Sequence, residues 1–141
     1  MRPRDITILV LNDFAYVNGG SAQVALASAK ALASRGYKVI LFAAVGPISI
    51  DLQQPNLSTI CLGQHEIVED PNRLRAFVQG MWNFRASREM ALLLKQLSPA
   101  TTIVHVHGWT KALSASVVRQ AAVRGFRVVC TLHDYFSACP N

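Results

Sequence analysis

The chain alternates between short apolar runs and longer amphipathic stretches, which is the pattern of strands followed by helices. The runs are rich in β-branched residues and lack polar alternation, as expected for strands buried on both faces of a parallel sheet. We expect strands over residues 7–11, 38–43, 57–62, 102–106 and 127–132. Between them, apolar residues recur at three- and four-residue spacing. This spacing predicts helices over residues 21–35, 73–97 and 111–124.

Small polar residues and glycines indicate where the helices begin and break. Ser21 or Gly20 is expected to cap the first helix, and Asp70 or Asn72 the long one. Gly80 is expected to divide the long helix into two.

Because strand and helix alternate throughout, right-handed crossovers should place consecutive strands parallel in one sheet. The predicted class is therefore α/β: a Rossmann-like parallel sheet with helices on both faces and strand order 3-2-1-4-5. In that order the winding reverses between the first and fourth strands. Ligands of such sheets bind at this point, beyond the carboxyl ends of the strands.

The composition is that of one globular domain. The chain has 141 residues, of which 51% are hydrophobic and 16% charged. No apolar run approaches the roughly 18 residues that span a bilayer. Arg2 and Arg4 precede the run 6–11, but no cleavage site follows, so we expect a buried strand there and not a signal peptide. The three cysteines show no C-x-x-C spacing, which argues against a zinc site and favours a reducing, cytoplasmic setting.

The formal net charge of +6 favours partners that carry phosphate, such as sugar nucleotides, anionic lipids or nucleic acid. The sequence has no zinc finger, RNA-recognition signature or basic run, so nucleic acid is not expected. Segment 73–90 interleaves Phe77 and Trp82 with arginines. It is interpreted either as a core stripe with a solvated basic face or as a contact with an anionic membrane.

Three segments follow directly on predicted strands, namely 13–20, 107–109 and 133–134. If the strand order is right, all three line one cleft. In the first, Gly19 and Gly20 precede a helix whose free N–H groups and partial positive charge suit a phosphate. The alternative is a tight capped loop, because the segment is neither a dinucleotide-binding fingerprint nor a P-loop.

Histidines supply the other candidates. His105 and His107 point to the same face of their strand, with His105 expected in the core and His107 at the strand tip. His133 can donate to a ligand hydroxyl or transfer a proton, and Asp134 can hold an acceptor hydroxyl. The alternative is a loop pair that bonds its own backbone. No third ligand accompanies the two strand histidines, so no metal is expected, and Cys139 is left unassigned.

Three motifs resemble family 4 retaining glycosyltransferases. They are Asn18-Gly19-Gly20-Ser21-Ala22-Gln23-Val24, Val104-His105-Val106-His107-Gly108-Trp109, and Val129-Cys130-Thr131-Leu132-His133-Asp134-Tyr135-Phe136 with Cys139-Pro140-Asn141. The resemblance covers nearly the whole chain. It implies the amino-terminal half of a GT-B fold, in which two Rossmann-like domains face each other across a cleft. Residues 1–141 would be a truncated acceptor-side domain, inactive alone, and the nucleotide-sugar domain would be absent from this chain.

The resemblance also implies residue roles. Gly19 and Gly20 would approach the donor diphosphate, His133 would be catalytic beside the donor sugar, and His107, Asp134 and Asn18 would lie near the acceptor or sugar. The enzyme would be a hexosyltransferase that retains configuration, uses no metal or other cofactor, and takes a nucleotide sugar and a glycan or lipid-linked acceptor in polysaccharide biosynthesis. Ala22 stands where many relatives are acidic. The enzyme would act in the cytoplasm, and contact with the cytoplasmic face of a membrane is left open.

Two other functions fit the same pattern. A stand-alone binding module with a flavodoxin-like sheet would act through protein partners and need no second domain. A GT-B sugar-nucleotide epimerase would change its sugar nucleotide without any acceptor.

Overall fold

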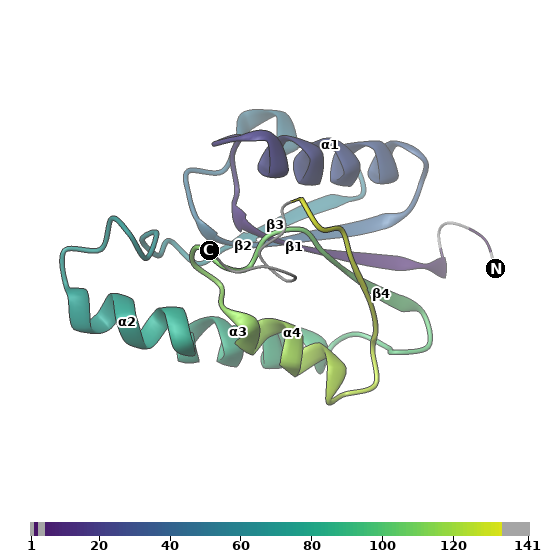
Figure 1. Ribbon diagram of the computed structural model, residues 1–141. Coiled ribbons are helices and arrows are strands. Elements are labelled where there is room, and N and C mark those ends of the chain that lie inside the picture. Colours follow the sequence, from purple (N-terminus) through teal and green to yellow (C-terminus); the bar gives the residue numbers. More distant parts are fainter. Residues whose placement is uncertain (1, 3–4, 134–141) are drawn as a thin grey trace.

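Five parallel strands form one sheet in the computed structural model, which describes residue 2 and residues 5–133 (Figure 1). The strands are β1 (Thr7–Phe14), β2 (Lys38–Val45), β3 (Leu57–Cys61), β4 (Thr102–Val106) and β5 (Arg127–Cys130). Their order is β3-β2-β1-β4-β5, and every neighbouring pair runs parallel. The predicted fold class and strand order are therefore confirmed.

Helices cover both faces of this sheet. They are α1 (Gly20–Ser34), α2 (Arg73–Met81), α3 (Phe84–Leu94) and α4 (Ala115–Ala122). Figure 1 shows α1 on one face and the other three helices on the opposite face. A short 3-10 helix, η2 (Ile50–Leu52), precedes β3 and was not predicted from the sequence.

The alternation of side chains along β1 divides the core into two halves. Ile8 and Val10 pack with α1, whereas Leu9 and Leu11 pack with α3 and α4. Leu9, Val10 and Leu11 are fully buried, which explains the continuous apolar run in the sequence. Each such side chain contributes roughly 1.5–3 kcal/mol on burial, so the two halves hold the central strands firmly in place.

The long helix predicted over 73–97 is two helices, and the break is not at Gly80, which lies inside α2. The predicted division into two helices is present, but its predicted place at Gly80 was wrong because Asn83 caps a new helix. Its side chain accepts the N–H of Ala86 at 2.9 Å, and its own N–H donates to the Ser114 hydroxyl at 2.9 Å. A buried asparagine with these partners overrides the apolar periodicity that runs through it.

Two cap predictions had different outcomes. Asn72 caps α2 as predicted, since its side chain accepts the N–H of Arg75 at 3.1 Å. The cap of α1 is Gly19, without any side-chain hydrogen bond, and not Ser21 or Gly20. The first turn of α1 therefore keeps free N–H groups.

Candidate functional site

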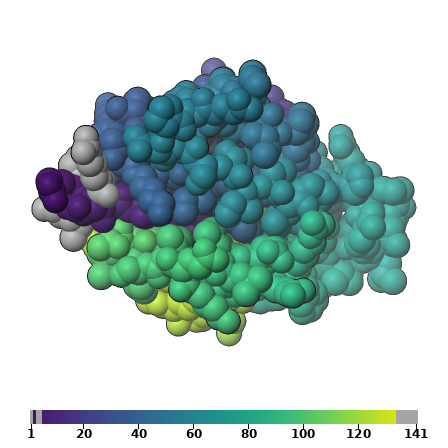
Figure 2. All heavy atoms as spheres, turned by 180° about the vertical axis from the view of Figure 1, so that it is seen from behind, coloured from purple at the N-terminus to yellow at the C-terminus, as the bar shows by residue number. Residues whose placement is uncertain are grey.

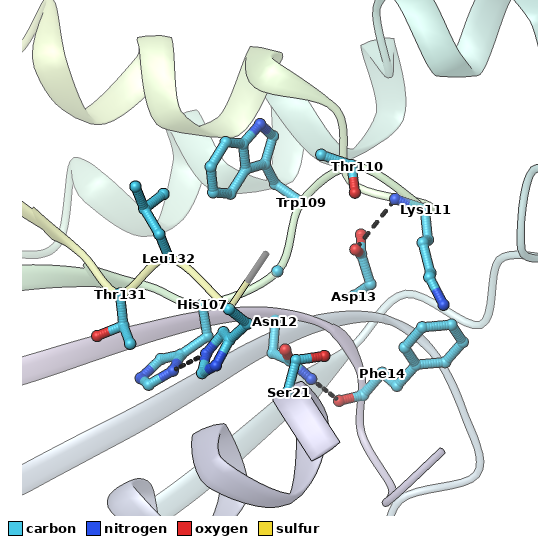
Figure 3. A pocket seen from close by; sticks show the side chains of 12 residues that line it. Asn12, Asp13, Phe14, Ser21, His107, Trp109, Thr110, Lys111, Thr131 and Leu132 are labelled. Atoms are coloured by element: carbon cyan, nitrogen blue, oxygen red, sulfur yellow. Dashed lines mark hydrogen bonds between the residues drawn. The ribbon is translucent and has the colours of Figure 1, made fainter. Parts of the chain in front are cut away.

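A small open cavity lies beyond the carboxyl ends of β1, β4 and β5 (Figure 3). This is the edge at which the strand order predicts a ligand. Each of the three predicted segments contributes to its wall, together with the first turn of α1. The lining residues are Asn12, Asp13, Phe14, Ser21, His107, Gly108, Trp109, Thr110, Lys111, Thr131, Leu132 and His133.

One wall of the cavity is built around Asp13, which is 3% exposed. Its carboxylate accepts backbone N–H groups from Lys111 at 3.1 Å, Ala112 at 2.9 Å and Leu113 at 2.8 Å. Figure 3 shows the side chain turned toward the start of Lys111. Burial raises the pKa of Asp13, and the three N–H groups act in the opposite direction. The carboxylate thus fixes the loop between β4 and α4 against the end of β1.

Gly108 belongs to the same wall, and its position leaves no room for a side chain. A Cβ atom there would lie 2.9 Å from Oδ1 of Asn12 and 3.4 Å from Oδ2 of Asp13. The amide of Asn12 is itself held, since it donates to the Phe14 carbonyl at 2.8 Å. Glycine therefore allows β1 and the loop after β4 to meet closely. The sequence predicts a strand over residues 7–11, but β1 continues through Asn12 and Asp13 to Phe14.

On another side the cavity is bordered by Ser21 in the first turn of α1, and the glycine loop 18–20 leads directly into this open wall. Asn18, Gly19 and Gly20 are exposed and are not themselves among the lining residues, although Ser21 is. Gly19 is extended, with φ 167°, and a Cβ atom at Gly19 or Gly20 would meet nothing within 4 Å. Neither backbone strain nor packing inside the described chain requires glycine here. The predicted roles of Asn18, Gly19 and Gly20 toward a ligand stay predictions.

Three histidines gather at the ends of β4 and β5. Nδ1 of His107 lies 3.0 Å from Nε2 of His133, and Nε2 of His105 lies 2.8 Å from the Thr131 hydroxyl. The rings of His105 and His107 are 4.1 Å apart between centroids, and those of His107 and His133 are 5.3 Å apart and stacked. His107 is 5% exposed. In the structure its ring contacts the other two histidines, while its predicted role at an acceptor stays a prediction.

Burial disfavours the charged form of two of these histidines, His105 and His107. Burial lowers the pKa of His107 from 6.5 to about 4, with further lowering from His105 and His133. Burial and His133 also lower the pKa of His105. Lys111 is the cationic side chain that lines the cavity; it is 59% exposed, lies 4.0 Å from the Glu66 carboxylate and stands 5.8 Å from the Phe14 ring centre. Asp13 and Lys111 were not recognised from the sequence as partners, although an aspartate directly after a buried run was a visible signal.

Metal-binding groups are not gathered in the described part of the chain: no three His, Cys, Asp or Glu side chains in residues 5–133 could together hold an ion. Cys61 and Cys130 are free thiols. Asp134, with its predicted role at an acceptor, and the unassigned Cys139 lie outside the described residues.

A second, larger hollow with about 1210 Å³ of space lies between residues 63–75 and helices α2 and α3. In Figure 2 the teal part of the chain stands out from the rest of the molecule. Exposed apolar side chains follow this projecting region. They are Val68, Leu74, Phe77, Val78, Met81 and Phe84. None of the helices in residues 5–133 has the length and apolar character to cross a bilayer.

The sequence matches a known protein family, and the fold is similar to that of a solved structure. The family model described as Glycosyltransferase Family 4 matches residues 18–140. Among solved structures, the chain is similar to the crystal structure of LpCGTa in complex with UDP, with 18% sequence identity and a TM-score of 0.54. This likeness covers 90% of the present chain and 30% of that chain, and it shows a shared fold. No curated protein matches the chain.

Proposed function

The chain belongs to glycosyltransferase family 4, and we propose that it forms the acceptor-side domain of a GT-B enzyme that transfers a hexose from a nucleotide sugar. The acceptor is a glycan or a lipid-linked glycan, the reaction retains the anomeric configuration, and no metal takes part. A second Rossmann-like domain would hold most of the nucleotide and close the cleft over the cavity. The enzyme would work on the cytoplasmic side.

The convergence at the first cavity is the observation that carries this proposal. The start of α1, the tip of β4 with His107, and His133 after β5 are far apart in sequence yet border one space. The uncapped first turn of α1 offers free N–H groups to a diphosphate, with Lys111 as a second positive group at the rim. His133 would donate to a sugar hydroxyl there. A similar structure is described as a complex with UDP.

The open space around Gly19 and Gly20 supports the same proposal. Nothing inside the described chain needs glycine at these positions. The glycines would instead allow a ligand or a facing domain to approach the backbone closely. A side chain there would keep such a group at a distance.

The test incubates the intact protein that contains this chain with a panel of sugar nucleotides and measures release of nucleoside diphosphate. The transferase proposal expects one donor to be turned over slowly without acceptor, and the His133→Ala variant, which lacks a hydrogen-bond donor beside the reacting sugar, to lose about 100-fold or more of that rate. His65→Ala is the matched control, since His65 does not line the first cavity. Formation of an epimeric sugar nucleotide would favour the epimerase, and absence of any donor binding would favour the binding module.

The projecting region is proposed to contact the membrane or the lipid part of the acceptor. Phe77 and Met81 are 65% and 66% exposed on α2, and Phe84 is 68% exposed at the start of α3. Apolar side chains flanked by Arg73, Arg85 and Arg88 in sequence suit an anionic bilayer surface.

Vesicle sedimentation tests this contact. The intact protein should bind vesicles with anionic lipid more strongly than neutral ones, and Phe77→Ser with Met81→Ser should weaken binding about tenfold. Ile50→Ser is the control, because Ile50 is 78% exposed but lies on η2. Equal loss in the control would show that the effect does not belong to the projecting region.

A further inference from the structure

The hydrogen bond between His107 and His133 joins two imidazole rings that are both able to donate and to accept. Nδ1 of His107 and Nε2 of His133 are 3.0 Å apart, so one of these nitrogens carries the shared proton and the other accepts it. Which one carries it decides the face that His133 offers to a ligand.

The environment of His107 settles the direction of this bond. Its other nitrogen, Nε2, is buried and has no hydrogen-bond partner among residues 5–133. A proton on Nε2 would leave an N–H group buried without an acceptor, which is unfavourable. A proton on Nδ1 is used, because it faces His133. A second proton is disfavoured, since the pKa of His107 is about 4 and the ring lies against His105.

We infer that His107 donates from Nδ1 to Nε2 of His133 and thereby holds His133 in the tautomer that carries its proton on Nδ1. His107 is then a positioning residue for His133. This form is the less common one for a neutral histidine in water. It needs a fixed donor at Nε2 in order to predominate, and the buried ring of His107 supplies that donor.

The inference limits what His133 can do, and this consequence rests on the proposed function. With Nε2 occupied, His133 cannot take up a proton there without breaking its bond to His107. Its free nitrogen presents an N–H group, which suits a hydroxyl of the donor sugar or a phosphate oxygen. His133 therefore acts as a hydrogen-bond donor to the substrate and not as a general base through Nε2.

Two-bond ¹⁵N–¹H correlation spectra of the chain with labelled histidine, recorded above pH 7, test the inference without any substrate. We expect the spectrum of His133 to show a proton on Nδ1. A proton on Nε2 of His133 in the wild-type chain would overturn the inference, whatever the variants do.

Two variants of His107 separate positioning from packing. His107→Asn keeps an N–H donor at the position of Nδ1 and should leave His133 in the same tautomer, whereas His107→Leu removes the donor and should release it. In the intact protein, kcat/KM for the donor should fall about tenfold in His107→Leu, the factor that one neutral hydrogen bond represents, and recover in His107→Asn. His65→Leu is the control.

The outcomes distinguish this inference from the proposed function. If the spectra show the Nδ1 proton but no sugar nucleotide is turned over, the tautomer stands and the transferase proposal fails. If turnover is found but His107→Leu leaves the His133 tautomer unchanged, the transferase proposal stands and the positioning role of His107 is wrong.

Discussion

The two walls of the cavity are built in opposite ways. Around Asp13 and Gly108 the backbone is packed so closely that a methyl group does not fit, and one carboxylate accepts three N–H groups. Around Gly19 and Gly20 the backbone is exposed, uncapped and free of close neighbours. Glycine occurs in both walls, but for different reasons: contact with this chain's own atoms in the first and open space in the second.

The difference separates residues that the packing of this chain explains from residues whose proposed role is to bind a ligand. Substitutions in the packed wall should lower the free energy of unfolding, because this chain supplies every partner. Substitutions in the open wall should leave stability intact and affect only what binds there.

Asp13→Ala should have the largest effect. It leaves three backbone N–H groups in a buried wall without acceptors, so we expect a loss of about 3 kcal/mol or more. Chemical unfolding of the chain measures this loss. Asp51→Ala is the control, since its carboxylate pairs with Lys30 on the surface and should cost less than about 1 kcal/mol. Equal losses for the two variants would contradict the special role of the packed wall.

Gly108→Ala should come next. Its Cβ atom would lie 2.9 Å from Oδ1 of Asn12, so the loop or the amide must shift, at a cost of about 2 kcal/mol. The His107 ring next to it should move as well, and histidine chemical shifts would report this. An unchanged unfolding midpoint would mean that the wall can adjust freely.

Acid should weaken the packed side of the cavity through His107. Its pKa is about 4 in the folded chain against 6.5 ordinarily, so between these values the unfolded chain binds a proton that the folded chain does not. The contribution of neutral His107 to the free energy of unfolding should be fully present above pH 6.5. It should fall by an amount on the order of 2 kcal/mol as the pH drops toward 4. Urea midpoints across this range should fall less steeply in His107→Asn, which has no imidazole to protonate there.

Gly20→Ala should have the smallest effect on stability. No atom lies within 4 Å of the added Cβ, so the change should stay within about 0.5 kcal/mol. Gly36→Ala is a matched control with the opposite expectation, because Gly36 has φ +90° and a side chain there would be strained by about 1 kcal/mol. In the intact protein Gly20→Ala should nevertheless weaken binding of the donor. A stable variant that binds the donor normally would contradict the role of the open wall.

The fold could be predicted from the sequence because its signals are local. Continuous apolar runs specify buried strands, three- and four-residue spacing specifies helices, and the order of strands follows from their alternation. Boundaries failed where a polar residue finds a partner far along the chain. Asn83 divides the long helix through Ser114, and residues 111–113, predicted as the start of the last helix, donate instead to Asp13, so α4 begins at Ala115.

The candidate site was only partly predictable for the same reason. His107 and His133 were recognised because each follows a strand, and the order of strands places those ends together. Their hydrogen bond, the burial of Nε2 of His107 and the anchoring role of Asp13 depend on the three-dimensional register of distant segments. No pattern in a single sequence encodes that register.

The anchoring of Asp13 also sets a limit on the order of folding. The N–H groups that it accepts lie 98 to 100 residues further along the chain, so the closure of a very long loop must precede these bonds. During synthesis, a nascent chain that has not yet exposed Leu113 can form β1, α1 and β2 but leaves this carboxylate without its donors. The cavity beside Asp13 therefore forms late, as one of the last parts of the domain to become structured.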